Sequence, residues 1–364
     1  MPSLPAPSNS ICLFRLSALG DVVMVLPLVR AIQASRPDAK LTWVIAKGAY
    51  PLVAGLAGEG VEFVVLEKPR GLADFREIRD RMAGRRFDVL LCLQASWRAN
   101  ILYPWITAGR KIGYRADRAK DFHGMFVRES IEPRRNHIAD AFLQFGEAIG
   151  VPAPAVPEWR LPVDPAAAAW AAGALPAGPL VALNPCASKA ERNWSEDHYA
   201  AVARELHARH GLVTILLGGP GADERRVAEK LKAALGDRAV DLVGRTTLPQ
   251  LVAVLARVRL LLAPDTGAVH IANALGRPVV GLYTSARCAR TGPYRHPEYC
   301  VDRYDEAVRR FLRRDPEREL WELRVHDRRA MDLITVAEVL RQCEAALSAD
   351  PPGMRRDPGS GILA

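Results

Sequence analysis

Short apolar runs of strand length alternate with segments of helical periodicity, and this alternation constrains the possible fold more than any other feature. Strand-like runs lie at 11–16, 41–45, 87–93, 180–184, 213–218, 260–263 and 279–283. The segment 21–35 has apolar residues at helical spacing and ends before Pro37. Strands that alternate with helices form a parallel sheet. The sequence therefore predicts the α/β class, with two Rossmann-like, doubly wound parallel-sheet domains that face a cleft.

Proline content indicates where one domain ends and the next begins. Five prolines fall within 150–165, too many for a helix or a central strand. The predicted organisation is an N-terminal domain at 11–155, a proline-rich linker at 156–178, a C-terminal domain at 179–334, a helix at 335–348 and a disordered tail at 349–364. The stretch 299–331 is rich in charges of both signs, which favours a solvated helical face, with contact to a membrane surface as the alternative.

Composition limits the class of protein and its location. The chain has 364 residues, of which 49% are hydrophobic, enough for two cores. The first ten residues carry no basic side chain, and Arg15 and Asp21 interrupt the next apolar stretch, so we expect neither a secretory leader nor a membrane span, and a cytoplasmic location. Six cysteines without metal-binding spacing indicate reduced thiols, with Cys12 and Cys92 in the core. The net charge of +9 favours acidic partners, such as phosphorylated sugars, anionic lipids or nucleic acid, or reflects base composition alone.

The most specific local feature is a strand that turns directly into a helix at 264–270. In a parallel sheet such a turn leaves unpaired backbone amides and the positive end of the helix dipole at the ligand-binding edge, where anions collect. Thr266 is placed to cap the helix, Gly267 allows a ligand close to the backbone, and His270 lies one turn further along. A nucleotide diphosphate fits these groups. The alternative is that Asp265 and Thr266 only cap the helix and that His270 is a surface histidine.

Three further turns carry residues suited to substrate chemistry. After the first strand of the second half, Lys189 and Arg192 can hold a phosphate, one as a point charge and the other as a fork of donors. A glycine-rich turn leads to Glu224, a carboxylate suited to the hydroxyls of a ribose or a sugar. Near the N-terminus, Asp21 at the start of a helix is either an N-cap or a general base. The chain lacks both G-x-G-x-x-G and P-loop spacing, which argues against a nicotinamide dehydrogenase or an ATPase.

Together these motifs resemble glycosyltransferase family 9, the heptosyltransferases. The resemblance covers about residues 11–347 and rests on the turn at 16–23, the basic segment that ends at 192–194, and the turn at 265–270 with Gly-Arg-Pro at 276–278. It implies a GT-B enzyme that transfers a heptose from ADP-heptose to the inner core of lipopolysaccharide, at the cytoplasmic face of the inner membrane. It further implies inversion at the sugar, with no metal and no cofactor.

The resemblance also implies roles for single residues. Asp21 matches the general base that takes the proton of the acceptor hydroxyl. Arg192, helped by Lys189, matches the cation that binds the donor phosphates, and Glu224 matches an acidic residue on the nucleoside side. The donor-binding residues implied in this way are Ala187, through its backbone N–H, Ser188, Lys189, Arg192, Glu224, Asp265, Thr266, Gly267 and His270.

The acceptor is expected to bind the first domain. Ser17 and Gly20 flank the predicted base, and two basic clusters suit phosphate or carboxylate groups of a lipid-linked acidic sugar. The second cluster begins with Arg110 and Lys111, and the residues predicted to bind the acceptor are Lys68, Arg70, Arg115, Arg118 and Lys120. The alternative is a scattering of solvated arginines.

The predicted partners are thus a nucleotide-diphosphate sugar, the lipid-linked acceptor and the surface of the inner membrane. One alternative function is a nucleotide-sugar-binding protein of envelope assembly without catalysis. Another is a family member with a different donor sugar and acceptor. Binding to nucleic acid is not expected, because no recognisable reading module is present.

Overall fold

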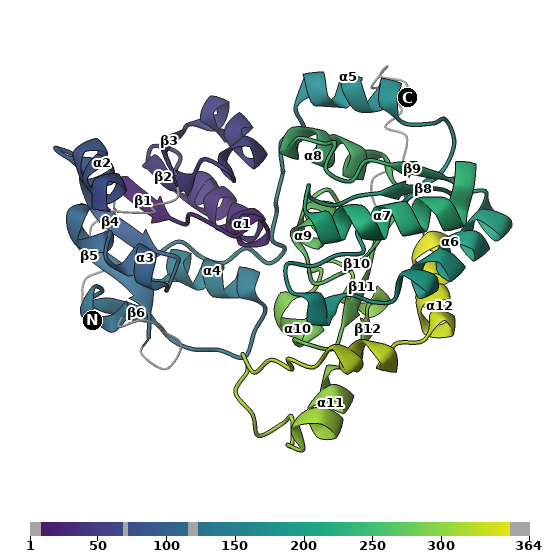
Figure 1. Ribbon diagram of the computed structural model, residues 1–364. Helices are drawn as coiled ribbons and strands as arrows, with labels where there is room; N and C mark the ends of the chain where they lie inside the picture. The colour runs from purple at the N-terminus through teal and green to yellow at the C-terminus, as the bar shows by residue number, and fades with distance from the viewer. Residues whose placement is uncertain (1–8, 68–71, 116–122, 350–364) are drawn as a thin grey trace. The chain divides into compact units, whose positions relative to one another are not determined.

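The chain divides into two compact units, Met1–Asp164 and Pro165–Ala364. The computed structural model, drawn in Figure 1, describes residues 9–67, 72–115 and 123–349. Each unit is a parallel six-stranded sheet with helices, as the α/β prediction requires.

The sheet of unit 1 has the strand order β3-β2-β1-β4-β5-β6, and all neighbouring strands run parallel. Its strands are β1 (Ser10–Phe14), β2 (Lys40–Ala46), β3 (Val61–Leu66), β4 (Arg86–Cys92), β5 (Thr107–Tyr114) and β6 (Glu129–Ile131). The central strand β1 is paired on both sides, with Ile11 opposite Leu41 and Val89. Its last four residues are buried because helices cover both faces of such a sheet.

The helices of unit 1 follow its strands. They are α1 (Leu19–Ser35), α2 (Leu72–Met82), α3 (Trp97–Asn100) and α4 (Ile138–Glu147), with short 3₁₀ turns η1 (Tyr50–Leu52), η2 (Ala54–Glu59), η3 (Tyr103–Trp105) and η4 (His123–Met125). Helix α1 packs against α4 and is buried along most of its length. The short turn 15–18 connects β1 to α1, so the first turn of α1 lies near the carboxyl end of β1.

Unit 2 repeats the same topology. Its sheet has the order β12-β11-β10-β7-β8-β9, again with parallel neighbours. The strands are β7 (Leu180–Leu183), β8 (Val213–Leu216), β9 (Ala239–Asp241), β10 (Leu260–Pro264), β11 (Val279–Tyr283) and β12 (Val301–Asp302). In both units the first and fourth strands in chain order are neighbours at the centre of the sheet, as in the Rossmann fold.

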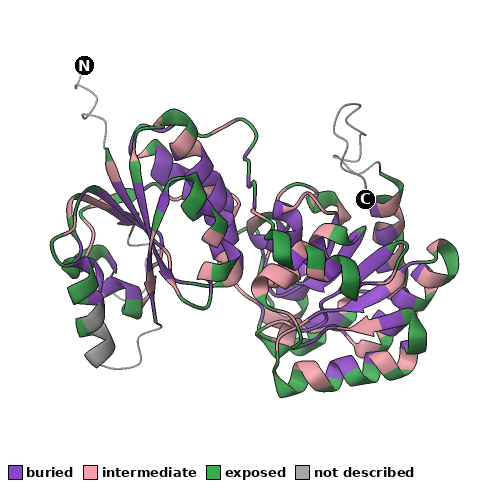
Figure 2. Cartoon of the chain, turned by 90° about the horizontal axis from the view of Figure 1, so that it is seen from above, coloured by how far each residue is buried: buried purple, intermediate pink, exposed green. Residues whose placement is uncertain are grey.

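The helices of unit 2 enclose a large core that includes Trp194. They are α5 (Pro165–Ala174), α6 (Glu196–His210), α7 (Ala222–Leu235), α8 (Leu248–Arg257), α9 (Gly267–Ala274), α10 (Cys288–Thr291), α11 (Tyr304–Ala307) and α12 (Val336–Ser348), with short turns η5 (Ala190–Arg192), η6 (Gly236–Arg238), η7 (Pro297–Tyr299), η8 (Val308–Leu312, π-helical) and η9 (Arg328–Leu333). Helix α12 packs against α6, and Trp194 joins them to the core, donating from Nε1 to Ile334 O (3.0 Å). Figure 2 shows the strands of each sheet as mostly buried.

The predicted linker is wrong in its second half. Helix α5 occupies Pro165–Ala174, inside the predicted 156–178, and packs against α8 of unit 2. The first half is held by unit 1, since Arg30 donates to the carbonyls of Trp159 (3.4 Å) and Arg160 (2.7 Å) and Trp159 is buried. The boundary between the units is therefore at 164/165. The predicted tail at 349–364 lies, from residue 350 on, outside the described residues.

The charged stretch 299–331 is more than a solvated helical face. Tyr304, Val308 and Val325 are buried together in a small core of their own, against which Phe311 and Leu323 pack. Its helices are short, four residues in α11 followed by the π-helical turn η8.

All six cysteines are free thiols, and Cys12 and Cys92 lie in the core as predicted. Over the described ranges, no helix combines the length and the apolar character needed to cross a membrane.

Candidate active site

Each sheet has one place where ligands are expected from topology alone. In a doubly wound sheet the chain leaves the first and fourth strands in opposite directions. The turns after their carboxyl ends form a crevice, which is called the switch point of the sheet. In unit 1 these are the turns after β1 and β4, and in unit 2 the turns after β7 and β10. The predicted base lies in the first pair of turns, and most predicted donor-binding residues lie in the second pair.

In unit 1, Asp21 lies in the first turn of α1 and pairs with Arg15. Arg15 follows β1, donates from Nη2 to Asp21 Oδ2, and donates from Nη1 to Leu93 O after β4 (2.6 Å). The N–H of Ala18 donates to the same oxygen, Asp21 Oδ2 (3.2 Å). Among the described residues no donor contacts Oδ1, and the side chain is 22% exposed. Asp21 therefore stabilises the helix start through one oxygen and has the other available for a substrate.

The turn after β4 supports this arrangement. The Gln94 side chain accepts a hydrogen bond from Leu16 N (3.0 Å) and donates to Ser96 Oγ (3.1 Å). The turns after β1 and β4 are thus joined by side-chain hydrogen bonds. Trp97 begins α3 beside them and is 54% exposed. Sequence reasoning found neither Arg15 nor Gln94, because their contacts join segments far apart in the chain.

The predicted acceptor residues are only partly placed. Ser17 is exposed next to the Asp21 turn, and Gly20 is buried within α1. Arg115 is exposed and lies 3.0 Å from Glu132, so it already has an acidic partner. Of the other predicted acceptor residues, Lys68, Arg70, Arg118 and Lys120 lie outside the described residues. Arg110 and Lys111, at the start of the second cluster, are engaged by Glu129 (2.6 Å) and by the carbonyl of Tyr103 (2.6 Å).

In unit 2, Asp265 lies between two arginines. Arg192 Nη1 is 3.1 Å from Asp265 Oδ2, and Arg324 Nη1 is 3.5 Å from the same oxygen. The three side chains are 13% (Asp265), 15% (Arg192) and 29% (Arg324) exposed, so water screens them poorly. The group carries one negative and two positive charges at the start of helix α9. Sequence reasoning predicted Asp265 and Arg192 but missed Arg324, which comes from the charged stretch.

At the helix start of α9, the predicted capping by Thr266 needs a correction, and the alternative of a surface His270 is excluded. Thr266 occupies the N-cap position, but its side chain makes no capping hydrogen bond, and Oγ1 is buried without a hydrogen-bond partner. His270 is no surface histidine, because only 6% of it is exposed. Gly267 is the first residue of the helix, as predicted. The first backbone N–H groups of a helix have no partner within it, so this turn offers donors to an anion.

Two other predicted donor residues are engaged in local structure. The N–H of Ala187 donates to Asn193 Oδ1 (2.7 Å), so it is not free for a phosphate as predicted. The Glu224 carboxylate accepts from Gly219 N (2.8 Å) and Gly221 N (3.3 Å), which makes it the cap of α7. Ser188 and Lys189 are exposed.

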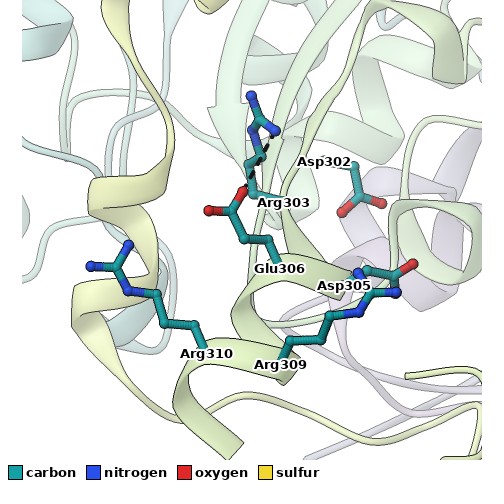
Figure 3. A pocket seen from close by; sticks show the side chains of 6 residues that line it. All are labelled: Asp302, Arg303, Asp305, Glu306, Arg309 and Arg310. Carbon is teal, nitrogen blue, oxygen red and sulfur yellow. Dashed lines mark ion pairs between the residues drawn. The ribbon is translucent and has the colours of Figure 1, made fainter. Parts of the chain in front are cut away.

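A mixed-charge hollow of about 670 Å³ lies elsewhere in unit 2, around α11 (Figure 3). None of the predicted site residues lines this hollow. It is lined by Asp302, Arg303, Asp305, Glu306, Arg309 and Arg310. Three of these side chains are acidic and three are basic, so their formal charges balance. Within the described ranges no three His, Cys, Asp or Glu side chains are placed to hold a metal ion.

Known proteins resemble the chain over nearly all its length. The model of glycosyltransferase family 9 (heptosyltransferase) matches residues 75–320. The lipopolysaccharide core heptosyltransferase OpsX of Haemophilus influenzae is 31% identical over 344 residues, which are 94% of this chain and 98% of the relative. The lipopolysaccharide heptosyltransferase 1 of Pseudomonas aeruginosa is 24% identical over 78% of this chain and 81% of its own.

Solved structures agree in fold. A family 9 glycosyltransferase from Veillonella parvula superposes with a TM-score of 0.74 at 19% identity and covers 93% of this chain and 97% of its own. The E. coli heptosyltransferase WaaC with ADP gives a TM-score of 0.71 at 18% identity and covers 93% and 99%. Both the predicted fold class and the predicted resemblance are confirmed. The chain belongs to glycosyltransferase family 9 and is a glycosyltransferase.

Proposed function

We propose that this chain is an inverting, metal-independent heptosyltransferase that moves heptose from ADP-heptose to an acidic acceptor sugar of the lipopolysaccharide core. The name of the 31% identical relative and the WaaC structure with ADP support the substrate class. The observation that carries the proposal is a carboxylate with one available oxygen, Asp21, at the switch point of unit 1, together with a net cationic turn at that of unit 2.

In this proposal Asp21 is the general base. Its Oδ1 accepts the proton of the acceptor hydroxyl while the hydroxyl oxygen forms a bond to the anomeric carbon of the heptose. The bond from that carbon to the diphosphate oxygen breaks, and ADP leaves with the electron pair. Because the hydroxyl attacks the face opposite the leaving group, the configuration at the anomeric carbon inverts. Arg15 holds the carboxylate in a fixed direction through Oδ2.

Unit 2 is proposed to bind the donor. Arg192 Nε is buried without a hydrogen-bond partner, so this guanidinium has a donor left for a phosphate oxygen besides its contact with Asp265. The exposed Ser188 and Lys189 and the amides at Gly267 extend the same surface. His270 and Asp265 are proposed to position the donor. Fixed cations and a helix start stabilise the negative charge that develops on the departing diphosphate.

Unit 1 is proposed to bind the acceptor near Ser17 and Gly20, and to associate peripherally with the inner face of the inner membrane. Two tryptophans support membrane contact, since Trp97 is 54% and Trp105 is 39% exposed and α3 contacts η3. Aromatic rings of this kind prefer the interface between lipid and water. Cosedimentation with vesicles that contain anionic lipid tests this part, and Trp97→Ser should weaken it.

The proposed activity is tested by incubating the purified chain with ADP-heptose and a heptose-free core acceptor. We expect release of ADP that requires the acceptor and persists in a metal chelator, and a product whose new linkage has the inverted anomeric configuration. A protein that only binds nucleotide sugars would raise its melting temperature with ADP-heptose but release no ADP. Stabilisation by a different nucleotide sugar, with no response to ADP-heptose, would contradict the proposed donor.

A further inference from the structure

The geometry points to Arg324 as a second phosphate-binding arginine of the donor site, brought there by the folded segment 303–331. This inference rests on the proposed function, in which unit 2 binds a nucleoside diphosphate. It gives the charged stretch a role in substrate binding that its sequence pattern did not indicate.

The first observation is that donors outnumber acceptors around Asp265. Arg192 Nη1 and Arg324 Nη1 lie 3.1 and 3.5 Å from one carboxylate oxygen, Asp265 Oδ2. Arg324 Nη1 makes no hydrogen bond, and neither do Arg192 Nε and Thr266 Oγ1, although all three atoms are buried. Buried polar atoms normally have partners, and one carboxylate cannot neutralise two guanidinium groups. The site therefore suits an additional anion that carries several acceptor oxygens, and a diphosphate is such an anion.

The second observation is that the segment is fixed to the site at three consecutive residues. Arg324 contacts Asp265 in the turn after β10. Val325 N donates to Ser285 O in the turn after β11 (2.9 Å). His326 Nδ1 lies 2.9 Å from Glu191 Oε1, next to Arg192 in the turn after β7. Since three separate turns of the sheet hold 324–326, the position of Arg324 follows from the fold.

The third observation is an aromatic clamp that keeps the segment folded. The Arg287 guanidinium lies 4.6 Å from the ring centre of Tyr304 and 5.2 Å from that of Trp321. Arg287 also pairs with Asp305 (3.0 Å) and donates to Pro316 O, and its side chain is 12% exposed. The segment is thus attached to the sheet by a buried cation at one end and by 324–326 at the other.

The test compares the affinities for ADP and for adenosine, measured by calorimetry on the full chain. Arg324→Gln removes the charge, Arg324→Lys keeps it without the fork, and Arg328→Gln removes an exposed arginine of the same stretch as the matched control. We expect Arg324→Gln to weaken ADP binding by about tenfold or more, the scale of a lost charge-assisted hydrogen bond, and to leave adenosine binding unchanged. Arg324→Lys should restore part of the ADP affinity, and Arg328→Gln should bind like the wild type.

Two results would overturn the inference while the proposed function stands. One is an ADP affinity of Arg324→Gln equal to that of Arg328→Gln. The other is an equal loss of ADP and adenosine binding, which would mean that Arg324 only supports the structure. If Arg324→Gln fails to fold, the affinities for ADP and for adenosine are compared in Arg324→Lys, which retains the charge. A loss of ADP affinity with unchanged adenosine affinity supports the inference, and an ADP affinity equal to that of the wild type overturns it. Absence of ADP binding in the wild type would instead remove the proposed function, and the inference with it.

Discussion

His123 in unit 1 is a buried histidine whose hydrogen bonds require a neutral ring. No part of the residue is exposed. Nε2 accepts from Tyr114 N (3.1 Å), and Nδ1 lies 2.7 Å from Asn100 Oδ1. Because the Tyr114 amide is a donor, Nε2 carries no proton, and Nδ1 donates to the Asn100 oxygen. Burial lowers the pKa of His123 from 6.5 to about 4.

This lowered pKa makes the stability of the fold fall on acidification. Above pH 6.5 the ring is neutral in both states and adds no pH dependence. Between 6.5 and about 4 the unfolded chain binds a proton that the native ring does not, so the free energy of unfolding decreases as the pH falls. Below about 4 both states are protonated and the loss is complete. At about 1.4 kcal/mol per pH unit, the full loss amounts to about 3 kcal/mol.

The assay is urea unfolding of wild type and His123→Gln from about pH 7.5 to about pH 4, followed by circular dichroism. The difference between the two proteins cancels the titrations that they share. We expect the stability advantage of the wild type to shrink on acidification by an amount that approaches 3 kcal/mol. The control Gly58→Ala, which adds no titratable group and whose Cβ would meet no atom within 4 Å, should show no such trend. A difference between wild type and His123→Gln that stays constant with pH would refute the reasoning.

Two further predictions concern the capping of α7 by Glu224 and the close packing around Gly113. Glu224→Ala should lower the stability of the ligand-free protein by about 1 kcal/mol in thermal unfolding, because the amides of Gly219 and Gly221 lose their acceptor, whereas Glu229→Ala on the same helix should not. An unchanged melting temperature would contradict its capping role. Gly113→Ala should cost about 2 kcal/mol or more in urea unfolding, because its Cβ would lie 2.7 Å from Val127 Cγ1 and press against His123. Gly58→Ala, with open space around it, is the control, and equal midpoints for the two variants would count against this packing.

The parallel sheets could be predicted because their central strands are almost wholly apolar. Strands β1, β4, β7, β10 and β11 are buried runs with clear ends, and they define the two switch points. Strand β3 was missed because buried and more exposed residues alternate along it, with Glu62 exposed at its second position, as at a sheet edge. Helix α5 is not evident from the proline content, which predicts a linker through Pro165, although proline is favoured in the first turn of a helix.

The positions of the candidate site residues could be predicted where these residues lie in the turn between a strand and the next helix. Asp21, Arg192 and Asp265 come within a few residues of a helix start, so their place at the switch points follows from local pattern. Arg15, Gln94 and Arg324 act through contacts between segments distant in sequence, which a single sequence does not reveal. The corrections at Ala187, Thr266 and Glu224 concern hydrogen bonds within turns, and these depend on side-chain directions that spacing does not determine.

The central claim is that unit 1 supplies the general base and unit 2 binds the donor. It is tested most directly by measuring ADP affinity and turnover in Asp21→Asn and Arg192→Gln, with the exposed Asp38→Asn as the control. We expect Asp21→Asn to bind ADP like the wild type, because the donor is proposed to bind unit 2, and to lose turnover by about a hundredfold or more, because the carboxylate base is removed. Arg192→Gln should lose ADP affinity by about tenfold or more. Retained turnover in Asp21→Asn, or unchanged ADP binding in Arg192→Gln, would contradict the account.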